Sequence, residues 1–157
     1  MTAAPVAIRP AIAQDAPAIA DLLAGIGWFA SYQTGTVAEH TRAIANLIHA
    51  AQDRSLLLVA TTADSTPVVG YCATHWLPTA ILKVWDACVS ELFIADNARG
   101  ADIGARLLDH AVQAAREKAC ARIWLVNHRD CDSYQRSFYA QQGWQEQPQS
   151  ARFVLTL

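Results

Sequence analysis

The feature that most constrains the fold is a strand, a glycine-containing turn and a long helix in direct succession. Residues 84–95 are rich in apolar side chains, as expected for a buried strand. Residues 96–104 contain Gly100 and Gly104 and open a helix. The apolar side chains of this helix recur at helical spacing, at Ile103, Leu107, Ala111, Val112 and Ala115. The unit predicts a sheet with a helix packed against it.

Other strands and helices are predicted on both sides of this unit. The strands are expected at residues 6–10, 55–62, 68–77, 84–95, 122–127 and 152–157. Further helices are expected after an Asp15 cap, after the capping-box pattern Thr36-x-x-Glu39, and over 132–142, with residues 28–33 as a loop. The order βααβββαβαβ predicts an α/β fold with one layer of mixed sheet and helices on both faces. The length suits a single domain, residues 1–157.

Composition excludes several classes of protein. Hydrophobic residues make up 53% of the chain and charged residues 17%, so intrinsic disorder is not expected. Twelve basic and fourteen acidic residues give a net charge of −2, which argues against nucleic acid or membrane partners. No apolar run approaches the roughly 20 residues of a membrane-spanning helix. Residues 1–5 show no signal-peptide pattern, and we expect a cytoplasmic protein.

The cysteines and histidines lack the spacing of a metal site. No CxxC pair occurs among the cysteines at positions 72, 88, 120 and 131, which predicts reduced thiols. Neither HxxxH nor HExxH occurs among the histidines at positions 40, 49, 75, 110 and 128. The sequence therefore predicts no metal.

The turn before the long helix has features of a phosphate site. The N-terminus of a helix presents unpaired N–H groups and a partial positive charge, and glycine lets a ligand approach the backbone closely. The spacing of Gly100 and Gly104 fits neither a P-loop nor a dinucleotide-binding motif. On these residues alone, a turn that simply requires two glycines is the alternative.

Two motifs in order resemble those of the GNAT (GCN5-related N-acetyltransferase) superfamily. The first family motif, [RQ]-x-x-G-x-[GA], is matched by Arg99-Gly-Ala-Asp-Ile-Gly104. The second, N-x-x-A-x-x-[FL]-Y-x-x-x-G-[FW], is matched by Asp132-Ser-Tyr-Gln-Arg-Ser-Phe-Tyr-Ala-Gln-Gln-Gly-Trp144. The opening Ile8-Arg-Pro…Asp15-Ala-Pro also looks like the first strand and helix of the family. The resemblance therefore covers essentially the whole chain.

The resemblance implies acetyl transfer from acetyl-CoA to an amine. The pyrophosphate would bind main-chain amides of the turn, and the pantetheine arm would add like a strand beside the end of the preceding strand. The implied cofactor-binding residues are Phe93, Ile94, Arg99, Gly100, Ala101, Asp102, Ile103, Gly104, Ala105, Asp132 and Arg136. Asp102 replaces a family glycine, so its carboxylate would either repel the pyrophosphate or point to solvent as a first-turn anion.

Glu91 and Tyr139 are the implied catalytic residues. At pH 7 a lysine-like amine is almost fully protonated, which costs roughly 4–5 kcal/mol of barrier, and a general base removes part of this cost. Glu91 is an acidic residue in an apolar stretch, where burial would raise its pKa; the alternative is a half-exposed glutamate in a surface ion pair. His75 is the second candidate base. Tyr139 occupies the position of the family's general acid, and packing beside Phe138 is its alternative role.

The implied substrate-binding residues are three aromatic residues and a histidine: Trp28, Phe29, Tyr32 and His75. In the family the segment around residues 28–33 borders the acceptor pocket, where aromatic rings would hold a cationic amine; helix packing is the alternative. The expected substrate is a primary amine of a small molecule, whose nitrogen attacks the thioester carbon of acetyl-CoA directly. A protein or peptide N-acetyltransferase and a non-catalytic acyl-CoA-binding domain are the alternatives. Homodimers are common in the family.

Overall fold

The computed structural model describes residues 6–62 and 67–157. The chain divides into two compact units, Met1–Leu125 and Val126–Leu157. The first unit contains the sheet and the longer helices, and the second contains two short helices. None of the described helices has the length and apolar content that a membrane crossing requires.

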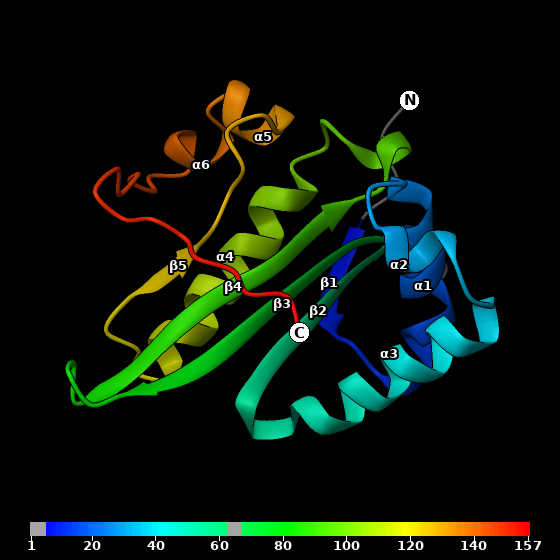
Figure 1. The fold of residues 1–157 in the computed structure, drawn as a ribbon, viewed down its shortest axis with the longest axis horizontal. Coiled ribbons are helices and arrows are strands. Elements are labelled where there is room, and N and C mark those ends of the chain that lie inside the picture. Colours follow the sequence, from blue (N-terminus) through cyan, green and yellow to red (C-terminus); the bar gives the residue numbers. More distant parts are fainter. Residues whose placement is uncertain (1–5, 63–66) are drawn as a thin grey trace. The chain divides into compact units, whose positions relative to one another are not determined.

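A five-stranded sheet in the order β1-β2-β3-β4-β5 lies at the centre of the first unit (Figure 1). Strands β1 (Val6–Pro10), β2 (Ser55–Thr62), β3 (Val68–Thr79) and β4 (Val84–Ile94) pair antiparallel in succession. Strand β5 (Ile123–Leu125) pairs with β4 in parallel. The predicted mixed sheet is thus confirmed.

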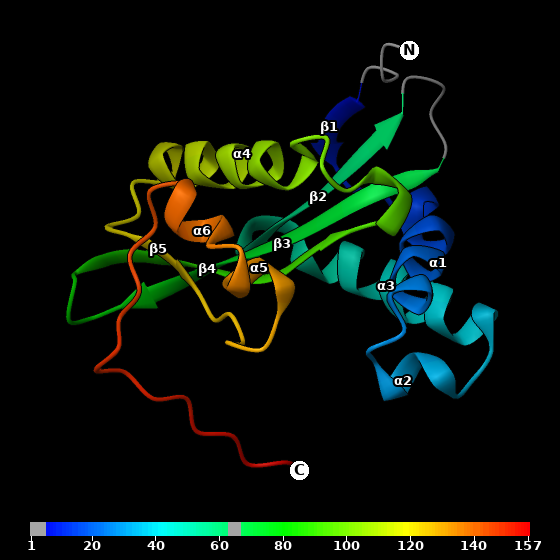
Figure 2. The same cartoon turned by 90° about the horizontal axis from the view of Figure 1, so that it is seen from above.

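Helices cover both faces of this sheet (Figure 2). Helices α1 (Ala16–Ile26) and α3 (Val37–Ala51) pack on one face, and α4 (Ile103–Glu117) packs on the other. The segment predicted as a loop at 28–33 contains a single helical turn, α2 (Ala30–Gln33). The α/β class with helices on both faces is confirmed.

The two predicted helix starts in the first unit differ in how they are built. Helix α3 begins with the predicted capping box, in which the Glu39 amide donates to Thr36 Oγ1 (3.2 Å) and the Thr36 amide donates to Glu39 Oε2 (2.7 Å). Asp15 lies at the start of α1, but its side chain does not cap that helix. Its carboxylate instead accepts two hydrogen bonds from Arg9, at 2.7 and 2.8 Å, and one from the Ile12 amide.

Each sheet face has its own core. On the α1/α3 face, Ile19 and Leu23 are buried with Val59 and Tyr71. On the α4 face the helix lies close to the strands at Gly70. A Cβ atom at that position would meet side-chain atoms at 3.0–3.1 Å, from Leu107, Ile103 and Ile94. Gly70 therefore sets how closely α4, with the turn that precedes it, approaches the sheet.

The second unit corrects two sequence-based predictions. The helix predicted at 132–142 is two short ones, α5 (Asp132–Gln135) and α6 (Phe138–Gln141), because Ser137 between them adopts a left-handed conformation (φ 58°). The strand predicted at 152–157 is absent, and its side chains are exposed. A pattern of apolar residues favours an extended chain, but a strand forms only where another strand accepts its hydrogen bonds.

Candidate active site

Glu91 lies half-buried on β4, directly beside a β-bulge. The register pairs Ala73 with Glu91 and Thr74 with Val89, so Ser90 is an extra residue on β4. A bulge bends its strand and re-aims the side chains around it. The candidate base therefore stands at an irregular point of the sheet.

Burial raises the pKa of the Glu91 carboxyl group above its usual range. A hydrogen bond from Tyr71 and the charge of His75 act in the opposite direction but do not cancel the effect of burial. The Tyr71 phenol is itself buried, and its pKa is raised first by burial and then by the charge of Glu91. The phenol consequently stays protonated and donates to the Glu91 carboxylate.

Aromatic residues cluster on the part of the first unit that holds this carboxyl group. Phe29 packs edge-to-face on Phe93, with ring centroids 5.2 Å apart, and on Tyr32 at 6.4 Å. The pKa of Tyr32 is raised by burial and by the negative charge of Glu91, which places its phenol in the field of that carboxylate. The structure thus brings Phe29, Tyr32 and Glu91 together, whereas Trp28 is 62% exposed.

His75 is held from both sides by serine hydroxyl groups. Its Nδ1 atom lies 2.7 Å from Ser55 Oγ on β2, and its Nε2 atom lies 2.7 Å from Ser90 Oγ at the bulge. Local sequence patterns did not predict that Tyr71, Ser55 or Ser90 belongs to the site. Only the pairing of β2, β3 and β4 brings them next to His75 and Glu91, and no local pattern reports that register.

The turn before α4 has two left-handed sites, one on either side of Ala101. Gly100 has φ 78° and Asp102 has φ 55°. The family motif has glycine where this chain has Asp102, and the backbone angle gives the reason, since aspartate is among the few other residues that tolerate the left-handed region. Asp102 is exposed, and its side chain makes no capping hydrogen bond to α4. Arg99 pairs with Asp96 across 2.9 Å.

The first amides of α4 lack partners within the helix. The first intrahelical bond of this helix runs from the Arg106 amide to the Asp102 carbonyl (3.0 Å), so the amides of residues 103–105 precede it. Ile103 is 3% exposed and fixes the helix start to the sheet. A rigid set of backbone donors at the positive end of a helix suits an anion.

Strands β4 and β5 pair over only three residues. Ala87, Cys88 and Val89 face residues 123–125, and within the described chain β5 pairs with β4 no further. Residues 90–94, which include Phe93 and Ile94, therefore keep backbone groups on that edge that no strand in the described chain occupies. Such an edge can accept an extended ligand that carries amide groups.

The motif residues of the second unit interact with one another. Arg136 pairs with Asp132 across 3.1 Å, and its guanidinium group lies 4.8 Å from the centroid of the Phe138 ring. The Tyr139 ring packs edge-to-face on Phe138 at 5.0 Å and on Trp144 at 6.2 Å. Tyr139 is thus part of a small aromatic cluster in its own unit.

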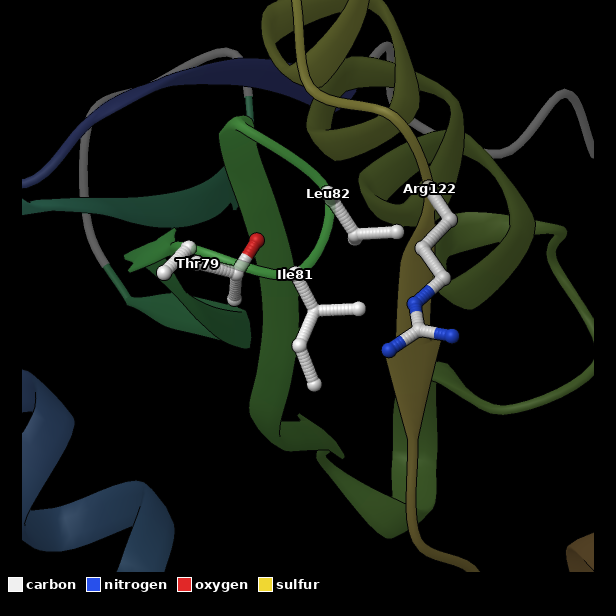
Figure 3. Close-up of a pocket in the computed structure, with 5 residues that line it drawn as sticks. Thr79, Ile81, Leu82 and Arg122 are labelled. Atoms are coloured by element: carbon white, nitrogen blue, oxygen red, sulfur yellow. The ribbon is translucent and has the colours of Figure 1, made fainter.

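A hollow on the first unit lies outside this set of residues (Figure 3). It has a volume of about 310 Å³ and is lined by residues 79–82 of the β3–β4 hairpin and by Arg122. Arg122 also binds the buried carboxylate of Asp86 at 3.0–3.2 Å. This hollow contains none of the residues that the sequence identified as site candidates.

Comparison with solved structures shows the fold. A transcriptional regulator from Bacillus halodurans C-125 aligns with a TM-score of 0.77 at 22% identity, over 96% of this chain and 100% of that one. The ribosomal-protein-alanine N-acetyltransferase of Brucella melitensis biovar Abortus 2308 gives 0.76 at 20%, over 98% and 100%. An aminoglycoside acetyltransferase from an uncultured soil metagenomic sample, in complex with sisomicin, gives 0.77 at 17%, over 97% and 96%.

Sequence comparison shows the family. No curated protein matches the chain at a significant level. A family model does match: that of the acetyltransferase (GNAT) family, over residues 24–144, which include both the turn before α4 and the Tyr139 segment. With more than half of its length in that match, the chain belongs to the GNAT family of acetyltransferases.

Proposed function

We propose that this protein is an N-acetyltransferase that transfers the acetyl group of acetyl-CoA to a primary amine of a small molecule by direct attack. The observation that carries the proposal is Glu91, a half-buried carboxyl group with a raised pKa among aromatic rings, on the strand that leads into the turn before α4. We treat residues 1–157 as one catalytic domain.

The residues of the turn and of the β4 edge fit acetyl-CoA. The amides of residues 103–105 would bind the pyrophosphate, and the edge of residues 90–94 would bind the amide groups of the pantetheine arm. Acetyl-CoA, when bound, supplies an electrophilic thioester carbonyl group. Asp132 and Arg136 are retained as motif-based candidates for cofactor contact.

Glu91 would act as the general base. An amine enters as its ammonium form, and the carboxylate removes one proton, which leaves a neutral nitrogen able to attack the thioester carbon. The nitrogen–carbon bond then forms and the carbon–sulfur bond breaks. Tyr139, by its place in the motif, would give its proton to the departing thiolate. The attacking nitrogen loses its second proton to water, which leaves a neutral amide, and the Tyr139 phenolate regains a proton from water.

The surroundings of Glu91 favour a small cationic acceptor. The Glu91 carboxylate would attract a cation by its charge. The ring of Tyr32, whose phenol lies in the field of that carboxylate, and the ring of Phe29, which packs on Tyr32, would add cation–π contacts. The test is release of free thiol from acetyl-CoA with a panel of amino acids, polyamines, aminoglycosides and peptides. Turnover with the small amines supports the proposal. Turnover with peptides alone would support a protein N-acetyltransferase, and binding of acetyl-CoA without turnover would support a non-catalytic domain.

Replacing Tyr139 with phenylalanine tests the acid. The variant keeps the ring contacts with Phe138 and Trp144 and removes only the hydroxyl group. We expect kcat to fall about tenfold or more while KM for acetyl-CoA stays within about twofold. Steady-state kinetics measure this result, with Tyr134→Phe as the matched control in the same unit. An unchanged kcat would remove Tyr139 from the mechanism.

Replacing Asp102 with asparagine tests the turn. Asparagine tolerates the left-handed backbone as well as aspartate does, so the change removes charge without disturbing the turn. If the carboxylate faces the pyrophosphate, Kd for acetyl-CoA should fall about three- to tenfold, with a smaller gain at high salt. Isothermal titration calorimetry measures this, with Asp109→Asn on the exposed part of α4 as control. An equal Kd would show that the carboxylate faces solvent.

A further inference from the structure

Ser55, His75 and Ser90 form a hydrogen-bonded bridge across three strands. Ser55 begins β2, His75 lies on β3, and Ser90 is the extra residue of the β4 bulge. Both ring nitrogens of His75 are used, each with a hydroxyl oxygen at 2.7 Å. We call these three residues the serine–histidine bridge.

The serine–histidine bridge holds the bulged residue Ser90, which the β3–β4 backbone pairing does not hold. An extra residue has no backbone partner on the neighbouring strand, so its position depends on other contacts. For Ser90, which is exposed, the contact in the described chain is the hydrogen bond to His75. Glu91 follows directly, so any movement of the bulge changes the direction of the Glu91 side chain.

The bulge also explains how one histidine affects two consecutive residues. Neighbouring side chains on a regular strand point to opposite faces. Here His75 binds the Ser90 hydroxyl group, and Glu91 pairs with Ala73, which lies two residues from His75 on β3 and so points to the same face. Both side chains therefore lie on the face of the sheet that carries His75, which a regular strand would not allow.

We propose that the serine–histidine bridge fixes the β4 bulge and thereby aims the Glu91 carboxylate, so that His75 is a positioning residue of the site. The proposal rests on the proposed function for its catalytic consequence, but the mechanical role of the bridge does not depend on it. A hydroxyl group can donate or accept, so the two serines bind the imidazole ring in either tautomer and also when it is protonated.

Three variants separate the hydrogen bonds of His75 from its charge. His75→Leu removes both, Ser90→Ala removes the bond at the bulge, and His75→Gln keeps one donor and one acceptor without a positive charge. His49→Leu on the exposed side of α3 is the matched control. The double variant His75→Leu/Ser90→Ala should be no worse than His75→Leu, because both changes remove the same bond.

The first measurement is hydrogen exchange, which needs no substrate. We expect the amides of residues 88–92 to exchange at least about tenfold faster in His75→Leu and Ser90→Ala, while the amides of α4 keep their rates. His75→Gln should remain close to the wild type. Unchanged exchange in both bridge variants would overturn the proposal, whether or not the protein turns over an amine.

The second measurement is the kinetics of amine acetylation. His75→Leu should lower kcat about 10- to 50-fold, because the Glu91 carboxylate loses its orientation. KM for acetyl-CoA should stay within about twofold. His75→Gln should keep kcat within about threefold at pH 8. In His75→Gln, the acid side of the kcat–pH profile should move to higher pH. The reason is that no protonated imidazole is present to lower the pKa of Glu91.

The pH profile of the site also depends on the titratable groups near Glu91 and His75. Glu91 is acted on by Tyr71 and His75, its charge acts on Tyr32, and His75 faces Cys88 across the β3–β4 register. Wild-type kcat in His75→Leu, or additive losses in the double variant, would contradict the bridge. A wild-type enzyme inactive with every amine would contradict the proposed function instead, and the exchange data would still decide the bridge.

Discussion

Replacing Glu91 with glutamine should lower kcat for the amine about 100- to 1000-fold at pH 7.5, because the neutral amide cannot accept the proton of the ammonium group. Glutamine has the same shape and still accepts the hydrogen bond from Tyr71. KM for acetyl-CoA should stay close to that of the wild type. Initial rates across pH measure the loss, and the wild-type rate should rise with pH through the raised pKa of Glu91.

The same variant should be more stable than the wild type. The folded-state pKa of Glu91 is raised above its unfolded value, so its ionisation opposes folding. This loss of stability is absent below the unfolded-state pKa of Glu91. It grows as pH rises from that pKa through the folded-state pKa, and it is complete above the folded-state pKa. Glu91→Gln should therefore raise Tm at pH 8 and leave it nearly unchanged at pH 4.

Thermal unfolding at these two pH values checks the effect on stability. Glu117→Gln, on the exposed end of α4, is the control and should change neither Tm nor kcat by much. A Tm gain without loss of activity would show that Glu91 is buried for another reason and that another group is the base. A loss of kcat without any gain in Tm would support Glu91 as the base. It would contradict the prediction that the buried Glu91 carboxylate lowers stability.

Replacing Gly70 with valine should destabilise the protein by about 3 kcal/mol, or roughly 6–12 °C in Tm. Even a Cβ atom would lie 3.0 Å from a methyl group of Leu107 and 3.1 Å from Ile103 and Ile94. Leu107 and Ile103 are 0% and 3% exposed, so these side chains have no open space into which to move. Helix α4 must then shift away from the sheet and carry the turn with it.

Gly25 provides the opposite case. It lies within α1, its φ is not positive, and a Cβ atom there would meet nothing within 4 Å. Gly25→Ala should therefore stabilise the protein by about 0.5–1 kcal/mol through helix propensity. Thermal unfolding of both variants is the measurement. Equal, small effects at the two positions would contradict the close packing of α4 at Gly70.

Local pattern was enough to predict the strands and the longer helices of the first unit. The apolar stretch at 84–95, the capping box at Thr36 and the helical spacing after Ile103 each depend on residues close in sequence. The predictions that were wrong depend on more distant events. The segment 152–157 has the composition of a strand but no strand partner, and the helix at 132–142 is broken by the left-handed Ser137.

The candidate site was predictable only in part for the same reason. Glu91 could be predicted as a site residue because it is a carboxylate within an apolar stretch, which is visible from the neighbouring residues alone. Tyr71 and Ser90 could not, since their place beside Glu91 and His75 follows from a one-residue shift in the β3–β4 register. No sequence-based prediction included the bulge, and the bulge determines which side chains meet.

The left-handed backbone at residue 102 has a consequence for how this family can diverge. The turn requires a residue that tolerates positive φ, and glycine is one solution among a few. Codons for glycine and aspartate can differ by a single base, so one point mutation can place a negative charge here while the loop keeps its shape. If Asp102→Asn changes the affinity for acetyl-CoA, a single base change can alter that affinity without any remodelling of the scaffold.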